Sequence, residues 1–178
     1  MNPITDFASE ARNWQGFYIL TGTAAATLTG LMFLSVTFGA RLVTKKTVTA
    51  AQAFMTPTAL HFVHAFGVSC LMVVPTMTAP VLGWLLVVLG TLRILFLRWV
   101  YGVFGKIHKE SGTIEWTDWV YHVALPLLSY LLAITTGAGF LYGIDAAFNG
   151  LALYVLLITV VGILVAWDLL MWLALKIT

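Results

Sequence analysis

Five long apolar segments follow one another along the chain, separated by short polar stretches. The segments cover residues 17–40, 57–76, 81–103, 119–141 and 148–175. Each reaches the length of about 20 residues that an α-helix needs to cross the hydrocarbon core of a bilayer. The pattern therefore predicts an all-α integral membrane bundle of five transmembrane helices, with residues 1–178 forming a single transmembrane domain. The connector at 76–80 is very short, which predicts that the second and third segments form an antiparallel hairpin.

The residues before the first segment show a different pattern. Apolar side chains recur at helical spacing within residues 1–15, and charged side chains fall between them. This is typical of a helix that lies in the membrane interface, and an ordinary polar tail fits the same residues. The sequence has no basic stretch leading directly into a short apolar core, as a signal peptide would have. We therefore expect the first apolar segment to be an uncleaved span.

The composition agrees with a chain that is surrounded by lipid. Hydrophobic residues make up 61% of the sequence and charged residues 9%, whereas about a quarter of the residues of a soluble domain are charged. The net charge is only +2. No basic patch interleaved with aromatic residues is evident, so we expect no nucleic-acid partner.

The basic residues are unevenly divided between the two sides of the predicted bundle. One side holds the connectors after the first and third segments and the C-terminus, with Arg41, Lys45, Lys46, Lys106, Lys109 and Lys176. The other side holds only Arg12. Since Lys and Arg are enriched on the cytoplasmic side of membrane proteins, we expect the N-terminus outside and the C-terminus in the cytoplasm.

Two charged residues lie well inside apolar segments, Arg93 in the third and Asp168 in the fifth, whereas Arg98 lies near the cytoplasmic boundary of the third. Charged groups at this depth are costly, and they usually face the interior of the bundle and pair with one another. Counted from the cytoplasmic ends, the two residues lie at similar depths, which predicts an ion pair. Such a pair either locks two helices together or sets the field of an ion path, and the sequence does not separate these roles.

Three histidines form a second polar group. His61 and His64 are three residues apart and share one helix face, and His122 begins the fourth segment at a similar depth. Four roles stay open: hydrogen bonds between helices, a proton relay, a divalent metal site built from His61, His64 and His122, and haem held by His64 and His122. The sequence requires no cofactor.

Small residues recur every four positions in the first segment, at Gly22, Ala26 and Gly30. This small-xxx-small pattern lets two helix backbones approach closely. The seam could join copies of the chain, pack within one copy, or line a polar pore. In the fourth segment, Pro126 has no N–H to offer the carbonyl at position 122, which predicts a kink.

Signatures of common enzymes are absent from the sequence. It has no Walker A loop, no GxSxG and no HExxH. The single cysteine, Cys70, excludes an internal disulfide and a cysteine-based zinc site. An enzyme stays open only if the cytoplasmic polar cluster is catalytic, and the sequence favours a protein that is not an enzyme.

Two stretches carry a resemblance to other proteins. The opening GFYILTGTAAATLTGLMFLSVTFGARL and the closing AWDLLMWLAL resemble small, uncharacterised bacterial inner-membrane proteins that have about five transmembrane helices. The resemblance covers nearly the full length. It implies a multi-pass protein of the bacterial inner membrane, and it implies no activity.

These observations favour a small channel or transporter-like protein that forms a homo-oligomer in the lipid bilayer. Its polar site is expected to open toward the cytoplasm and to consist of His61, His64, Arg93, His122 and Asp168. Two other hypotheses stay open. One is a metal- or haem-binding membrane protein, and the other is a non-catalytic accessory subunit that works with a protein partner in a larger complex.

Overall fold

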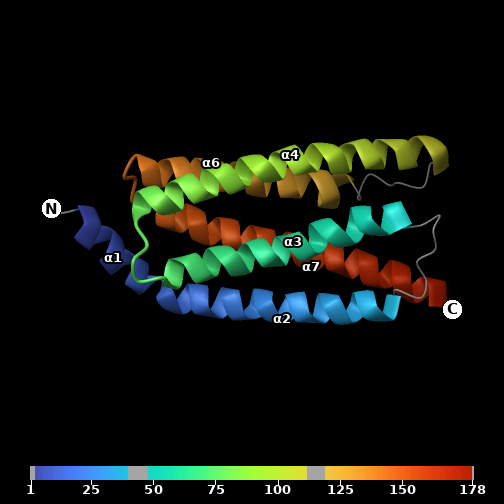
Figure 1. Ribbon diagram of the computed structural model, residues 1–178, viewed down its shortest axis with the longest axis horizontal. Coiled ribbons are helices and arrows are strands. Elements are labelled where there is room, and N and C mark those ends of the chain that lie inside the picture. The colour runs from blue at the N-terminus through green and yellow to red at the C-terminus, as the bar shows by residue number, and fades with distance from the viewer. Residues whose placement is uncertain (1–2, 40–47, 112–118, 178) are drawn as a thin grey trace.

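The computed structural model describes residues 3–39, 48–111 and 119–177, and these ranges are helical, without strands (Figure 1). Six α-helices and one π-helical turn, η2, lie within them. Their bounds are α1 Pro3–Asn13, α2 Gln15–Gly39, α3 Val48–Val73, α4 Ala79–Ser111, η2 Val120–Ala124, α6 Leu125–Leu141 and α7 Ala147–Ile177. The all-α prediction is confirmed for the described part of the chain.

The five long helices run side by side in alternating directions (Figure 1). Helix α1 and the α3–α4 and α6–α7 links lie at one end of the bundle, called here the α1 end, and the C-terminus lies at the other. Helix α3 packs mainly against α2 and α7, while α6 packs against α7 and α4. Only a minor contact joins α3 to α4. Helices α3 and α4 run in opposite directions, as the predicted hairpin requires (Figure 1). Most of the packing of each, however, is with other helices.

Four helical stretches are long and apolar enough to cross a membrane, namely Gln15–Ser35, Ala79–Trp99, Val120–Leu141 and Ala147–Asp168. The apolar part of α3 within the described side chains, Thr58–Val73, is shorter. These lengths support a multi-pass membrane protein. The fifth crossing stays a prediction. So does the orientation: of the six basic residues of the predicted cytoplasmic side, Arg41, Lys45 and Lys46 lie outside the described residues, and for the other three the structure describes the helix backbone alone.

The outer surface of the bundle is apolar, as lipid requires. Large hydrophobic side chains are more than half exposed on several helices, including Leu20, Phe33, Trp84 and Trp167. Contiguous apolar surface of this kind is rare on soluble monomers. Large side chains also fill the interior, where Tyr18, Phe62, Leu82, Leu151 and Tyr154 are fully buried. The exposed apolar positions therefore indicate a lipid-facing surface rather than an unfilled core.

Two helices are longer than the apolar segments that predicted them. Helix α3 begins at Val48 instead of residue 57, and α4 continues to Ser111 instead of residue 103. The stretch added to α3 contains three alanines and one glutamine, and the stretch added to α4 contains two lysines and one glutamate, all residue types that favour helix. Hydropathy detects only the apolar part of a helix, and the helix itself can continue beyond that part.

Glycines set the closest approaches between helices. A Cβ on Gly83 of α4 would lie 2.8 Å from the carbonyl oxygen of Gly137 on α6, and a Cβ on Gly137 would lie 2.7 Å from that of Gly83. On α7, a Cβ at Gly162 would lie 2.7 Å from the ring of Phe62 on α3. These distances are too short for any side chain, so the α4–α6 and α3–α7 contacts depend on glycine.

The small-residue seam of the first segment is divided between two faces of α2. Gly22 is buried, and a Cβ there would lie 3.0 Å from Cβ of Ser69 on α3. Beside it, the hydroxyls of Thr21 and Ser69 lie 3.1 Å apart in a hydrogen bond. Ala26 and Gly30 are exposed. Gly22 thus packs within one copy of the chain, while a role for Ala26 and Gly30 between copies stays a prediction.

A glycine ends α6 and turns the chain toward α7. Gly143 has φ +68°, a conformation that glycine adopts without steric cost. The N–H of Gly143 donates to the carbonyl of Phe140, and the N–H of Ile144 donates to that of Gly139. This is a Schellman motif, which satisfies carbonyls that the end of a helix would otherwise leave open.

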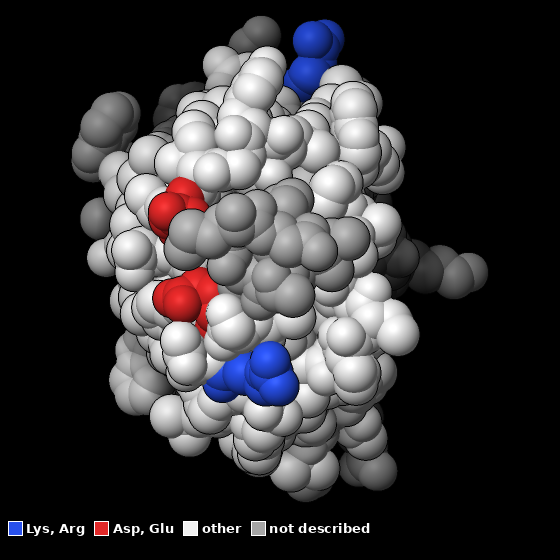
Figure 2. Space-filling model, turned by 90° about the vertical axis from the view of Figure 1, so that its left-hand side faces the viewer, with Lys and Arg blue, Asp and Glu red and all other residues white. Residues whose placement is uncertain are grey.

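Helix α1 confirms the helical part of the prediction for residues 1–15, and it is anchored at the α1 end by one aromatic side chain. Phe7 is 8% exposed, and its ring centroid lies 6.0 Å from that of Phe140 and 5.3 Å from that of Phe148. Figure 2, which faces this end, shows few charged side chains. The placement of α1 in a membrane interface stays a prediction.

Candidate functional site: a buried polar layer

The centre of the site is Arg93, which faces the interior from α4. It continues the buried stripe formed by Leu86 and Leu97, so the spacing of this helix directs the guanidinium into the bundle. Arg93 is 8% exposed. Its Nη2 donates a hydrogen bond of 2.7 Å to the carbonyl oxygen of Leu60 on α3. Its guanidinium carbon lies 5.9 Å from the ring centroid of Tyr130 on α6. One side chain therefore connects three helices.

His61 lies on α3 next to Leu60 and is 1% exposed. Its ring centroid lies 6.3 Å from that of Tyr130. Its Nδ1 atom is buried and makes no hydrogen bond within the part of the chain that the structure describes. Arg93, His122 and His64 are all close enough to His61 for their charges to act on it. The structure thus brings together four of the five residues that the sequence singled out.

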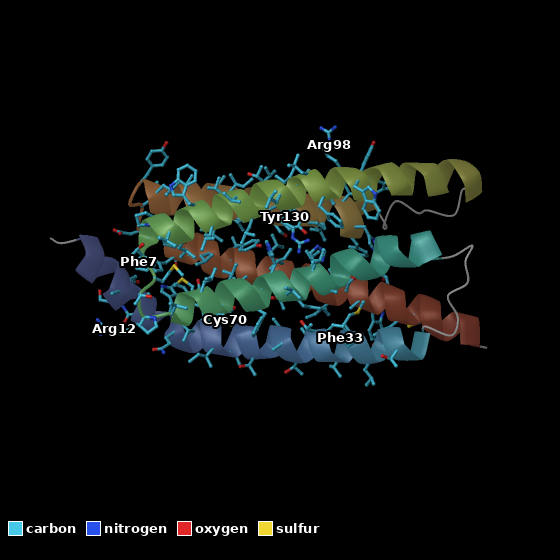
Figure 3. All side chains as sticks on the ribbon, in the orientation of Figure 1. Phe7, Arg12, Phe33, Cys70, Arg98 and Tyr130 are labelled. Carbon is cyan, nitrogen blue, oxygen red and sulfur yellow. The ribbon has the colours of Figure 1, made fainter. Side chains whose placement is uncertain are left out.

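His64, one helical turn further along α3, has a defined partner. Its Nδ1 and the hydroxyl of Tyr154 on α7 lie 2.7 Å apart in a hydrogen bond. Tyr154 is fully buried. We call His61, His64, Arg93, His122, Tyr130 and Tyr154 the polar layer. Figure 3 shows Tyr130, one of its members, in the middle of the bundle.

His122 lies within the π-helical turn η2. The N–H of Leu125 donates to the carbonyl of Val120, five residues back. Pro126 follows at once and has no N–H to continue the α-helical ladder. The predicted kink is therefore a π-helical turn, a feature that often marks functional sites. It holds His122 in the interior at 2% exposure.

Asp168 occupies a different position from the other predicted residues. It is half-buried and has interactions of its own. Counted from the α1 end, it lies about seven residues further along α7 than Arg93 lies along α4, or roughly 10 Å at about 1.5 Å per residue. Arg93, in contrast, is close enough to His64, Tyr130 and Tyr154 for its charge to influence all three side chains. The predicted Arg93–Asp168 ion pair stays a prediction.

The two tyrosines of the layer were not found from the sequence. Both lie inside apolar segments, where an aromatic residue is most simply a core residue. A signal was present nonetheless, because a buried tyrosine usually needs a partner for its hydroxyl. Tyr154 has one in His64, and no pattern along α7 reveals which helix would supply it.

The geometry does not favour the predicted metal site. Within the described residues, which include all three of its histidines, no group of three or more His, Cys, Asp or Glu side chains is placed to hold a metal ion. His64 also directs Nδ1 at a tyrosine. The haem hypothesis gains no observation from the structure and stays a prediction.

We expect Tyr154→Phe to lower the free energy of unfolding by about 1 kcal/mol, because it removes the hydrogen bond of the half-buried His64. Chemical unfolding in detergent, followed by circular dichroism, measures the change. Tyr142→Phe is the matched control, since Tyr142 is 82% exposed and should unfold as the wild type does. Equal stability of the two variants would show that the His64–Tyr154 hydrogen bond contributes nothing.

Comparisons of the chain with known protein families, with curated proteins and with solved structures give no match. Its function is therefore inferred from its own residues.

Proposed function

We propose that the chain is a small ion channel or transporter of the bacterial inner membrane, acting as a homo-oligomer with its C-terminus in the cytoplasm. The path runs through the polar layer. The observation that carries this proposal is the burial of Arg93 among His61, His64 and Tyr130 in a bundle whose outer surface is apolar.

The cost of the arginine supports a working role. A charged side chain at the centre of a bilayer is unfavourable by at least about 2.5–3.5 kcal/mol, and such residues mark substrate and ion pathways by default. The glycines Gly83 and Gly137 already hold α4 against α6, and that contact needs no charged group. Arg93 sets the field of the path, and His61 and His64 gate it or pass protons.

The members of the layer lie at different depths, and with Asp168 they form the path. Toward the predicted cytoplasmic side lie His122, in a π-helical turn, and Asp168, near the end of the apolar part of α7. Toward the α1 end, the His64–Tyr154 hydrogen bond links α3 to α7. Imidazole and hydroxyl groups in contact can hand a proton from one to the other.

Flux through liposomes tests the proposal. The purified full chain is reconstituted, and the fluxes of protons, potassium and chloride are followed separately with ion-sensitive dyes. We expect flux of at least one ion, and we expect His61→Leu to lower it at least tenfold, since about 1.4 kcal/mol added to a barrier has that effect. Cys70→Ala is the control, because Cys70 is exposed on the same helix.

Three results would contradict the proposal. Absence of flux for every ion would remove conduction, and a stoichiometric partner co-purifying from the native membrane would then indicate an accessory subunit. A Soret band or a bound metal in the purified protein would instead indicate a cofactor protein. Unchanged flux in His61→Leu would exclude the polar layer as the path.

A further inference from the structure

We propose that the ion bound in the polar layer is a small monovalent anion, such as a halide, nitrate or short carboxylate. The inference rests on the proposed function and names its substrate class. It is carried by the charge of the layer: the permanent cation Arg93 contacts a carbonyl oxygen and a tyrosine ring, and His61 lies within range of its charge.

Two contacts of Arg93 with described residues are defined, and both are with uncharged groups. It donates one hydrogen bond to the carbonyl oxygen of Leu60 and lies over the ring of Tyr130. Neither group carries a full negative charge. A guanidinium has five N–H donors in a planar fork that matches a carboxylate or similar anion. An anion would supply the partner that such a buried charge requires.

His61 adds a second donor at the same place. The His61 side chain is 1% exposed and lies within range of the charge of Arg93. Its Nδ1 makes no hydrogen bond to any described residue. In the tautomer that carries the proton on Nδ1, this atom donates. Together with the guanidinium of Arg93, it gives an anion donors from both α3 and α4.

The same residues disfavour a metal cation. Hard cations need several oxygen ligands, usually with negative charge. In the layer, the carbonyl of Leu60 accepts from Arg93 and the hydroxyl of Tyr154 is bonded to His64. At about 6 Å from Arg93, electrostatic repulsion alone would weaken cation binding roughly a hundredfold in a medium of intermediate dielectric constant.

The packing of the layer limits the size of the ion. Tyr130 is 3% exposed, Tyr154 is fully buried, and both lie among helices that pack closely. A bulky organic anion would have to separate these helices. Halide, nitrate and acetate ions are small, so they could bind beside a side chain without separating the helices. They are the probes for the experiment.

The experiment measures ion selectivity of the full chain in liposomes. Gradients of chloride, nitrate and acetate are imposed in turn, and the reversal potential reports whether anions or cations carry the current. We expect anion-selective flux, lowered at least tenfold by Arg93→Gln. Arg98→Gln is the matched control, because Arg98 is exposed on the same helix and points away from the bundle in Figure 3; its flux should equal that of the wild type.

The outcomes separate this inference from the proposed function. Proton or potassium flux without anion flux overturns the anion and leaves conduction in place, whereas no flux of any ion overturns both. Wild-type anion flux in Arg93→Gln overturns the assignment to Arg93. Should Arg93→Gln fail to give a monodisperse protein in detergent, the reversal potential of the wild type still decides the class of ion.

Discussion

Gly83→Leu should leave little folded protein, because α4 and α6 can no longer pack. A Cβ at this position would lie 2.8 Å from the carbonyl oxygen of Gly137 and 2.9 Å from the side chain of Leu141. The leucine side chain could give way, but the backbone oxygen could not without separating the helices. Overpacking of a core costs about 1–3 kcal/mol where the backbone can adjust. Here we expect more than about 3 kcal/mol, a large part of the roughly 5–15 kcal/mol that stabilises a typical protein.

Gly102→Leu is the control for this prediction. Gly102 lies on the same helix, and a Cβ there would meet nothing within 4 Å. Thermal unfolding and the yield of monodisperse protein in detergent measure both variants. If Gly83→Leu were as stable as Gly102→Leu, the close approach of α4 and α6 would not exist.

Phe7→Ala should release α1 from the end of the bundle without unfolding the long helices. The ring of Phe7 contacts Phe140 and Phe148, and burial of one phenylalanine side chain contributes about 2 kcal/mol. Losing this amount raises the population of detached α1 about 30-fold. Trypsin reports the change, because Arg12 lies in the last turn of α1 and becomes a better substrate when the helix detaches.

Phe33→Ala separates this effect from a general loss of hydrophobic surface. Phe33 is 71% exposed on α2. We expect cleavage at Arg12 to be as slow as in the wild type. Cleavage that is equally slow in Phe7→Ala would mean that the aromatic contacts do not hold α1.

Hydropathy predicted the number and order of the long helices because each apolar segment is a local property of the sequence. The ends of α3 and α4 were missed for the same reason: helix propensity continues past the apolar residues that hydropathy detects. The division of Gly22 from Ala26 and Gly30 depends on which face of α2 meets α3, and spacing along one helix does not contain that information.

The candidate site was predicted in part. Arg93, His61, His64 and His122 were found because a polar group in an apolar segment is conspicuous by itself. Their common neighbours Tyr130 and Tyr154 were missed, since a tyrosine differs from a core phenylalanine only by a hydroxyl. The partner of Arg93 was missed as well, because every residue has a carbonyl and only the fold brings that of Leu60 to the guanidinium.

The minor contact between α3 and α4 divides the bundle into two groups of helices. Helices α4 and α6 form one, helices α2, α3 and α7 form the other, and the packing of α6 on α7 joins them. A hinge at the α6–α7 contact would let the two groups rock against each other while each stays internally packed. The hydrogen bond from Arg93 to Leu60 joins the two groups at the minor α3–α4 contact. It would act as a latch, which a bound ion could open by competing for the same guanidinium.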